Sequence, residues 1–282
     1  MYNNSFTRRN PGLLIFLVDQ SSSMENTLLN KNYNLAQMVS DAINSILNML
    51  LYKNCYGEEI RRTSFVCIIG YGSDWYNAEI LLAEWIDNIN KPLVQVRDLL
   101  NTDLKKKWNN DAYWMEIYRK ADNGGMTPMA SAFSLAKDVT AAWVEEHNGL
   151  QDPAPCIINI TDGYPSDDEF ELISAANDIM KIVVPDGNSI IFNIHVSTDS
   201  NISKYEFPID ATLCSDESYR MLYELSSTIT NDLADGIFLF SERQLEDKEK
   251  LFVYNIDNIW DLYRYLHFAI EYAFHHKMFI EP

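Results

Sequence analysis

The chain of 282 residues is 47% hydrophobic and 22% charged, which is typical of a soluble globule of one or two domains and excludes wholesale disorder. Its 41 acidic side chains outnumber the 22 basic ones and give a formal net charge of −19. Such a chain lacks the positive surface that attracts phosphate backbones and anionic lipids, so we expect neither a nucleic acid nor a membrane as partner.

Short, continuous apolar runs, typical of strands buried within a parallel sheet, recur along the chain. The expected strands cover residues 13–18, 64–71, 78–85, 156–160 and 189–196, and two segments, 236–240 and 251–254, compete for the last strand. Between these runs, apolar residues recur at helical spacing. This pattern predicts helices over residues 33–52, 128–146, 167–183, 217–227 and 258–274.

Strands that alternate with amphipathic helices predict an α/β fold with a doubly wound, mostly parallel central sheet and helices on both faces. We expect an N-terminal tail over residues 1–11 and a single domain over residues 12–282. The region 86–123 breaks the alternation and is expected to be an insertion or irregular. It could hold a short helix at 92–100, a basic tip at 105–107 and an edge strand at 113–118.

The four cysteines are widely spaced and include no CxxC pair. Cys67 and Cys156 lie within apolar runs, where a cysteine usually acts as a small buried side chain, and this usage indicates a reducing compartment. The apolar run at 13–18 is shorter than a secretory signal requires, and no run approaches the roughly 20 residues of a membrane span. We therefore expect a cytoplasmic protein.

Polar side chains gather in three loops that should share one edge of the sheet. Asp19, Ser21 and Ser23 follow the first strand, and Asp162 follows the strand at 156–160. Thr127 begins the helix that leads into that strand, so it should lie at the same edge. Ligands of open parallel sheets bind at this carboxyl edge, where the winding reverses. If the first strand neighbours the strand at 156–160, the three loops converge.

The converging groups are two carboxylates and three hydroxyls, without a thiol or an imidazole. A set of oxygen ligands suits a small, hard cation, which predicts Mg²⁺, with Mn²⁺ as the possible substitute. Three neutral hydroxyls close to the ion would leave it electron-poor, so an acidic group from outside could complete its coordination shell.

These residues match a known pattern. Asp19-x-Ser21-x-Ser23, Thr127 in a Gly-Gly-x-Thr-Pro turn, and Asp162 followed by glycine resemble the metal-ion-dependent adhesion site of the von Willebrand factor A domain. The resemblance covers nearly the whole chain and is strongest to bacterial intracellular members of the tellurium-resistance type. It implies that Ser21, Ser23 and Thr127 coordinate the metal directly or nearly so, while Asp19 and Asp162 act through waters or hydrogen bonds.

The resulting hypothesis is a non-catalytic interaction module whose protein partner supplies an Asp or Glu to Mg²⁺. The resemblance implies partners in bacterial stress or signalling assemblies. Gln20 and Ser22 stand where the family commonly has small residues, which bears on the choice of partner. The expected docking loops are residues 20–26, 73–77, 124–126 and 164–168, with the large side chains Met24, Tyr76, Met126 and Tyr164.

Two other functions stay open. Asp19 could be the nucleophile of a Mg²⁺-dependent phosphotransferase or phosphatase, although position 21 is serine and the three loops contain no lysine or arginine. A metal-free structural scaffold is the second alternative. A serine hydrolase is disfavoured because the chain has no G-x-S-x-G elbow.

Several of the same residues also have purely structural interpretations. Thr127 before a proline is typical of a helix N-cap, and Ser166 with Glu169 has the spacing of a capping box. The pair His275 and His276 is more typical of an exposed helix end than of a metal site. Trp75, Trp108 and Trp114 are expected to serve packing, unless several are exposed together.

Overall fold

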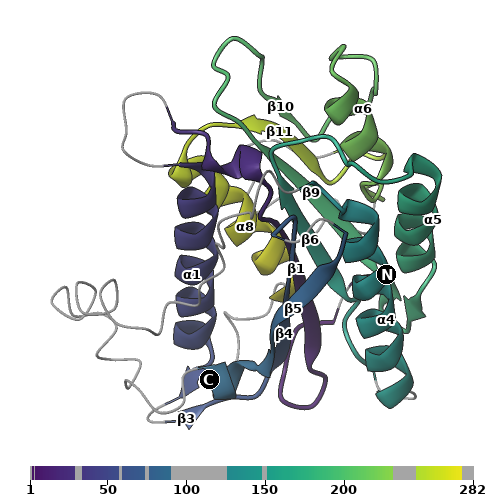
Figure 1. Cartoon of the computed structure of the whole chain (residues 1–282). Coiled ribbons are helices and arrows are strands. Elements are labelled where there is room, and N and C mark those ends of the chain that lie inside the picture. Colours follow the sequence, from purple (N-terminus) through teal and green to yellow (C-terminus); the bar gives the residue numbers. More distant parts are fainter. Residues whose placement is uncertain are drawn as a thin grey trace, which may run out of the picture.

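The computed structural model describes residues 2, 4–28, 34–56, 59–73, 76–89, 126–147, 151–230 and 246–274 (Figure 1). Within these residues the main element is a seven-stranded sheet. Its strands are β1 (Gly12–Asp19), β4 (Ser64–Tyr71), β5 (Ala78–Trp85), β6 (Cys156–Thr161), β9 (Ile190–Val196), β10 (Tyr205–Glu206) and β11 (Phe252–Ile256). Two short hairpins pair β2 (Cys55–Tyr56) with β3 (Glu59–Ile60) and β7 (Val183–Val184) with β8 (Gly187–Asn188). The helices are α1 (Leu35–Lys53), α2 (Ile86–Ile89), α4 (Met129–Glu146), α5 (Glu169–Met180), α6 (Glu217–Glu224), α8 (Ile259–Phe274) and the 3₁₀ turn η1 (Ser22–Glu25).

The strand order shows where a ligand site belongs in this sheet. The strands lie in the order β10–β11–β9–β6–β1–β4–β5, and only the edge strands β5 and β10 run antiparallel to their neighbours. From β1 the sheet grows outward to β4 and β5, whereas from β6 it grows in the opposite direction. The winding therefore reverses between β1 and β6, which is where open α/β sheets bind ligands. This is the doubly wound, mostly parallel sheet that the sequence predicts.

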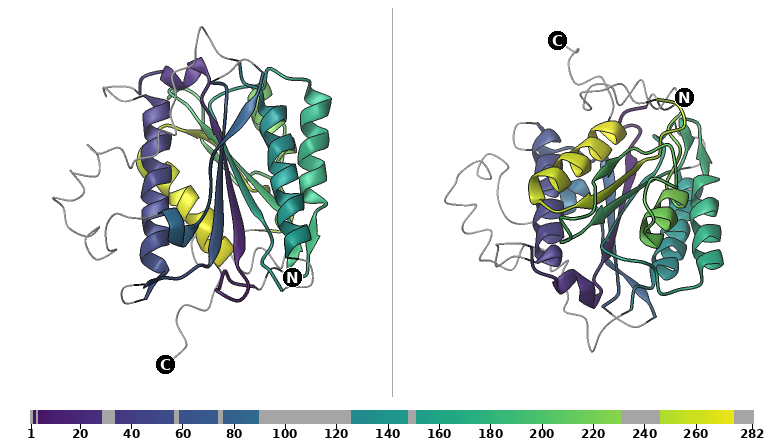
Figure 2. Two further views of the ribbon diagram at one scale, coloured as in Figure 1. Left: turned by 60° about the horizontal axis from the view of Figure 1, so that its bottom comes forward. Right: turned by 90° about the horizontal axis from the view of Figure 1, so that it is seen from above.

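Helices cover both faces of the sheet (Figures 1 and 2). In β1, Leu14 and Phe16 belong to the core beneath α1 and α8, whereas Leu13 and Ile15 belong to the core beneath α4, α5 and α6. All four side chains are fully buried. Because successive side chains of a strand point to opposite faces, a strand covered on both sides must be apolar at every position. The continuous apolar runs in the sequence have this origin.

Most predicted elements are confirmed. β4 and β5 have the predicted bounds, and α5 lies within the predicted range of 167–183 but is shorter at both ends. β11 corresponds to the candidate last strand at 251–254. The rival segment 236–240, residues 90–123 of the irregular region, Trp75, Trp108, Trp114, His275 and His276 lie outside the described residues.

The cysteines have the expected environment. All four are free, and Cys67 and Cys156 are buried in the core. Burial raises the pKa of both of these thiols to about 12, so they are protonated, apolar side chains. No helix in the described residues is both long enough and apolar enough to span a membrane.

The predicted capping box of α5 is wrong. The N-cap of this helix is Asp168, whose side chain accepts a hydrogen bond from the Glu171 N–H at 3.0 Å. Ser166 instead contacts Thr127: the Thr127 N–H donates to Ser166 Oγ, and the Ser166 N–H donates to the Thr127 carbonyl, both at 3.0 Å. The loop after β6 therefore pairs with the loop before α4, and Ser166 is drawn away from its own helix.

The alternative interpretation of Thr127 as the N-cap of α4 is also wrong. The helix begins at Met129 after Pro128, and no side chain preceding it in sequence forms a cap. The Asp167 carboxylate takes this role from the other loop, since it accepts a hydrogen bond from the Ala130 N–H in the first turn of α4. A carboxylate at a helix N-terminus accepts hydrogen bonds from the free N–H groups and interacts favourably with the helix dipole.

Candidate metal centre

Two carboxylates lie where the winding of the sheet reverses. Asp19 is the last residue of β1, and Asp162 directly follows the end of the neighbouring strand β6. The side chain of Asp19 is buried, with 1% of the residue exposed. The condition under which the predicted loops converge, pairing of the first strand with the strand at 156–160, is met.

Asp19 is held by a donor on each of its oxygens. Oδ1 accepts from the Ser21 N–H at 2.8 Å, and Oδ2 accepts from the Thr161 hydroxyl at 2.5 Å. The backbone between Asp19 and Ser21 is hydrogen-bonded to the adjacent strand β4, because the Gln20 N–H donates to the Tyr71 carbonyl at 2.6 Å. These contacts orient the carboxylate and set the direction in which the chain leaves β1.

The serine loop carries this hydrogen-bonded run to the second carboxylate. Ser21 Oγ lies 3.0 Å from Ser23 Oγ, and Ser23 Oγ donates to Asp162 Oδ1 at 2.7 Å. The 3₁₀ turn η1 keeps both hydroxyls on one side, with the Met24 N–H donating to the Ser21 carbonyl at 3.1 Å. Four of the five predicted site residues are thus linked by hydrogen bonds, Asp19 through the Ser21 N–H and the other three through their side-chain oxygens.

Thr127 reaches the same edge through its neighbours. Its pairing with Ser166 ties it to the loop after β6. Gly72, which follows β4, packs against both other loops: a Cβ there would lie 2.7 Å from Ser21 N and 2.9 Å from the Met126 carbonyl oxygen. Gly72 also has a φ of +94°, a backbone conformation that favours glycine. The structure therefore brings Thr127 to the edge where the other four residues lie.

A bound cation would relieve the electrostatic repulsion at this edge. Burial raises the pKa of Asp19, and burial together with the Asp19 charge raises the pKa of Asp162 to about 7. Among the described residues, neither carboxylate has an ion-pair partner. Two like charges in a buried place cost free energy unless a positive charge balances them.

The imidazole of His195, which pairs with Thr161 across β6 and β9, cannot supply that charge. Burial lowers the pKa of His195 to about 4, so the ring is neutral at pH 7. Its Nδ1 accepts from the Asn255 N–H at 3.3 Å, and the ring stacks on Tyr254 with a centroid distance of 4.1 Å.

The chemistry of the donor set fits a hard divalent ion. Carboxylate and hydroxyl oxygens are the ligands of Mg²⁺ and Mn²⁺, whereas zinc and copper prefer nitrogen and sulfur. In the described part of the chain, no cluster of three or more His, Cys, Asp and Glu side chains is placed to hold a metal.

Three residues that shape this edge were missed or misread from the sequence. Thr161 fixes Asp19, Ser166 holds Thr127, and Gly72 lets the serine and threonine loops approach each other. The signal for Thr161 was present, since it is a hydroxyl residue directly before Asp162 at the end of a strand expected beside the first strand. The roles of Ser166 and Gly72 depend on contacts between loops distant in sequence.

The predicted docking side chains divide into two groups. Tyr76, Tyr164 and Met126 are 75%, 42% and 39% exposed, as a docking surface requires. Met24 is fully buried and Gln20 is 1% exposed, so the expectation that these side chains meet a partner is wrong. Met24 belongs to the core beneath α1 and α8, and Gln20 lies over the strand residue Gly70.

No family model and no curated protein matches this sequence. Among solved structures, the chain is similar to the pilus adhesin SpaC from Lactobacillus rhamnosus GG, with a TM-score of 0.54 and 11% identity over 96% of this chain and 31% of SpaC. At that identity the likeness is one of fold. The chain shares the doubly wound, mostly parallel α/β fold of that structure, which is the fold class that the sequence predicts.

Two weaker similarities are to structures that hold a metal ion. Proximal thread matrix protein 1 from the mussel byssus, with a zinc-occupied MIDAS motif, has a TM-score of 0.48 and 14% identity over 94% of this chain and 48% of that one. Manganese-loaded TRAP protein from Plasmodium vivax has a TM-score of 0.45 and 15% identity over 95% of this chain and 76% of that one. This chain thus spans about a third of SpaC and about half of the byssus protein.

Proposed function

We propose that this chain is a protein-interaction module that binds its partner through a divalent metal ion, with Mg²⁺ preferred and Mn²⁺ as the substitute. The observation that carries the proposal is the hydrogen-bonded run Asp19–Ser21–Ser23–Asp162 at the switch point of the sheet. Two carboxylates without a counter-charge among the described residues support a cation there, and the oxygen donors support a hard one.

The neutral and the charged side chains of the site would have different roles. Ser21, Ser23 and Thr127 would hold the ion with neutral oxygens. Asp19 and Asp162 would supply negative charge behind them, since Asp19 is already occupied by two donors and Asp162 accepts from Ser23. A bound Mg²⁺ would offer an open coordination position to an Asp or Glu of a protein partner.

The exposed side chains at this edge support a docking face rather than a closed structural site. Tyr76, Met126 and Tyr164 are large and exposed. Met126 and Tyr164 lie within two residues of Thr127 and Asp162, and Tyr76 lines the same pocket as Ser166. Aromatic residues and methionine are enriched in interface cores. We propose that these neighbours select the partner, because one metal–carboxylate bond distinguishes few proteins. The motif resemblance extends the proposal to a bacterial cytoplasmic stress or signalling assembly.

The enzyme alternative has less support. A nucleophilic carboxylate needs a free oxygen that can reach a substrate. Both oxygens of Asp19 accept hydrogen bonds from within the chain, and the residue is buried. We therefore propose that the site is not catalytic.

Calorimetric titration tests the metal site directly. We expect one Mg²⁺ site, which Mn²⁺ also fills, in the full chain. Asp19→Ala should abolish it, because it removes both the charge and the anchor of the serine loop. Asp138→Ala, which removes an equal charge from the exposed side of α4, should leave it intact. Unchanged Mg²⁺ binding in Asp19→Ala would contradict the assignment, and absence of binding in the wild type would favour the metal-free scaffold.

A further inference from the structure

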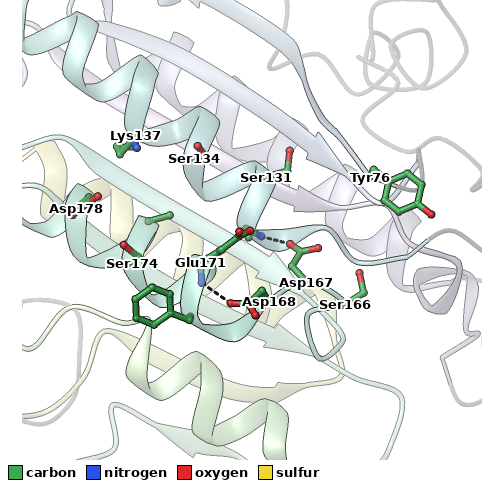
Figure 3. A pocket seen from close by; sticks show the side chains of 13 residues that line it. Tyr76, Ser131, Ser134, Lys137, Ser166, Asp167, Asp168, Glu171, Ser174 and Asp178 are labelled. Carbon is green, nitrogen blue, oxygen red and sulfur yellow. Dashed lines mark hydrogen bonds between the residues drawn. The ribbon is translucent and has the colours of Figure 1, made fainter.

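A groove runs between α4 and α5 on the outer surface of the molecule (Figure 3). Its volume is about 600 Å³, within the range of ligand-binding pockets in proteins. The groove exists because several of the side chains between the two helices are small. Ala130 and Ala175 are buried between the two helices, and the walls carry the short side chains of Ser131, Ser134 and Ser174.

One end of the groove adjoins the turn that carries the proposed ligand Thr127. Ser166 and Asp167 line it, and each also bonds to the α4 side: Ser166 Oγ accepts from the N–H of the proposed ligand Thr127, and Asp167 accepts from the Ala130 N–H. Exposed Tyr76 lies at this end (Figure 3). A partner segment whose carboxylate reaches the metal would therefore have the groove directly beside it.

The groove carries an excess of negative charge. Asp167, Asp168, Glu171 and Asp178 line it against the single cation Lys137. Asp167 and Asp168 each cap a helix. Glu171 is exposed and has no ion-pair partner among the described residues, and Asp178 has only a surface contact to Lys181 at 3.5 Å.

An aromatic side chain accompanies these charges. Phe170, next to Glu171 in sequence, lines the groove and is 80% exposed. Carboxylates next to an exposed ring suit a lysine or arginine, whose head group pairs with the acid while its stem covers the ring. An acidic segment would be repelled by these same side chains.

We propose that this groove binds a basic segment of the protein partner. The inference rests on the proposed function and specifies the partner further. The bound stretch would carry an Asp or Glu for the metal and, a short distance along the chain, a Lys or Arg that enters the groove beside Glu171. The acidic residue would make binding of the partner depend on the metal. The basic residue would add a selectivity among partners that a carboxylate alone lacks.

Peptide selection against the full chain tests this proposal. The probe is a displayed library of random peptides with one fixed central Asp, selected in Mg²⁺ and eluted with acid. We expect enrichment of Lys or Arg at a preferred offset from the Asp. Synthetic versions of the selected peptides, and their Gln-for-Lys or Gln-for-Arg counterparts, are then compared by fluorescence anisotropy in Mg²⁺ and in EDTA.

The groove variant is Glu171→Gln with Asp178→Asn, and its control is Glu145→Gln with Glu146→Gln, which removes equal charge from the exposed far end of α4. We expect the groove variant to weaken binding of basic peptides about threefold to tenfold. The control variant should bind like wild type, and all three proteins should bind Mg²⁺ alike.

The outcomes separate the two proposals. Mg²⁺-dependent peptides without Lys or Arg enrichment, or with equal affinity for the groove variant, would overturn the groove and leave the metal-dependent function standing. Basic peptides that bind equally in EDTA and weaken in the groove variant would uphold the groove and contradict the metal-dependent function.

Discussion

Thr161 illustrates how one hydroxyl holds the centre of the candidate metal site. Its Oγ1 donates to Asp19 at 2.5 Å and accepts from the Gly163 N–H at 3.2 Å, and the residue is fully buried. A side chain that touches no metal can thus control the orientation of a carboxylate behind the ligands.

The Thr161→Val substitution tests this role because it keeps the shape and removes the hydrogen bond. We expect the free energy of unfolding to fall by roughly 1–3 kcal/mol, as for a lost hydrogen bond to a charged group. Mg²⁺ affinity should fall about tenfold or more. Thr161→Ser keeps the hydroxyl and should retain the affinity. Equal affinities for the Val and Ser variants would show that Thr161 does not position Asp19.

The pKa of Asp162 makes a second prediction at this scale. Its folded value of about 7 lies above the ordinary value of 3.8, because of burial and the charge of Asp19. The folded state therefore binds this proton more tightly than the unfolded state. Without metal, the resulting stabilisation is complete below about pH 4 and is lost as the pH rises towards 7.

Denaturant unfolding in EDTA at a series of pH values measures this effect. Between pH 4 and pH 7 the Asp162 contribution should decrease by roughly 2–4 kcal/mol, since one pKa unit corresponds to about 1.4 kcal/mol. Asp162→Asn cannot titrate and should flatten this part of the profile. A wild-type profile that matches the variant would mean that the two carboxylates do not repel each other in the folded protein.

The convergence of the candidate ligands at one edge could be predicted from the sequence, while the residues that support them could not. Asp19, Ser21, Ser23 and Asp162 follow apolar strands, and the period of the sequence places them at one edge. Gly72 and Ser166 act between loops that meet only after the sheet has formed. The burial of Met24 was likewise unpredictable, because a methionine in a polar loop reads as exposed until the position of α1 is known.

At the scale of the elements, α4 owes its beginning to another part of the chain. Asp167 accepts hydrogen bonds from the first turn of α4, including the Ala130 N–H, although it precedes α5 in sequence. A cap supplied from a distant loop ties the two helices together at the edge of the proposed metal site. Local capping rules cannot detect such an arrangement, and they offer only Thr127 as a candidate.

Substitution of the two candidate caps separates the alternatives. Asp167→Ala should lower the free energy of unfolding by about 1–2 kcal/mol, the usual cost of a lost N-cap. Asp167→Asn retains an acceptor oxygen and should cost less. Denaturant titration gives these differences. A loss in Thr127→Ala that exceeds the loss in Asp167→Ala, measured in EDTA, would restore Thr127 as the structural cap.

The long elements could be predicted because their pattern is set by burial. Strands covered on both faces and helices covered on one produce periodicities that survive without knowledge of the fold. Strands of two residues are too short to show an alternation of apolar and polar side chains. For this reason none of them was predicted, and they are β2, β3, β7, β8 and β10. The antiparallel direction of β5 also follows from its connection to β4 rather than from its composition.

For the whole molecule, the net charge of −19 makes every bound cation favourable in a non-specific way. A specific site must therefore stabilise the fold beyond the general effect of salt. At a Mg²⁺ concentration about 100 times the Kd, binding to the folded state should add about 2.7 kcal/mol to the free energy of unfolding.

Thermal unfolding in Mg²⁺ and in NaCl of equal ionic strength measures the specific part. We expect Mg²⁺ to raise the Tm of the wild type by several degrees more than NaCl does. In Asp19→Ala the two salts should act alike. An equal Mg²⁺ response of both proteins would assign the stabilisation to surface charge and not to one site.

Gly72 offers a way to disturb this edge of the molecule without changing any proposed ligand. Every proposed ligand belongs to the loops after β1 and β6 or to the turn before α4, yet the spacing of two of these segments depends on the absence of a side chain on a fourth segment, after β4. A single methyl group there would act as a wedge against Ser21 and Met126. Gly72→Ala would then keep all five proposed ligand side chains and their total charge. It would test whether a chain that has the complete coordination motif can still bring those side chains together.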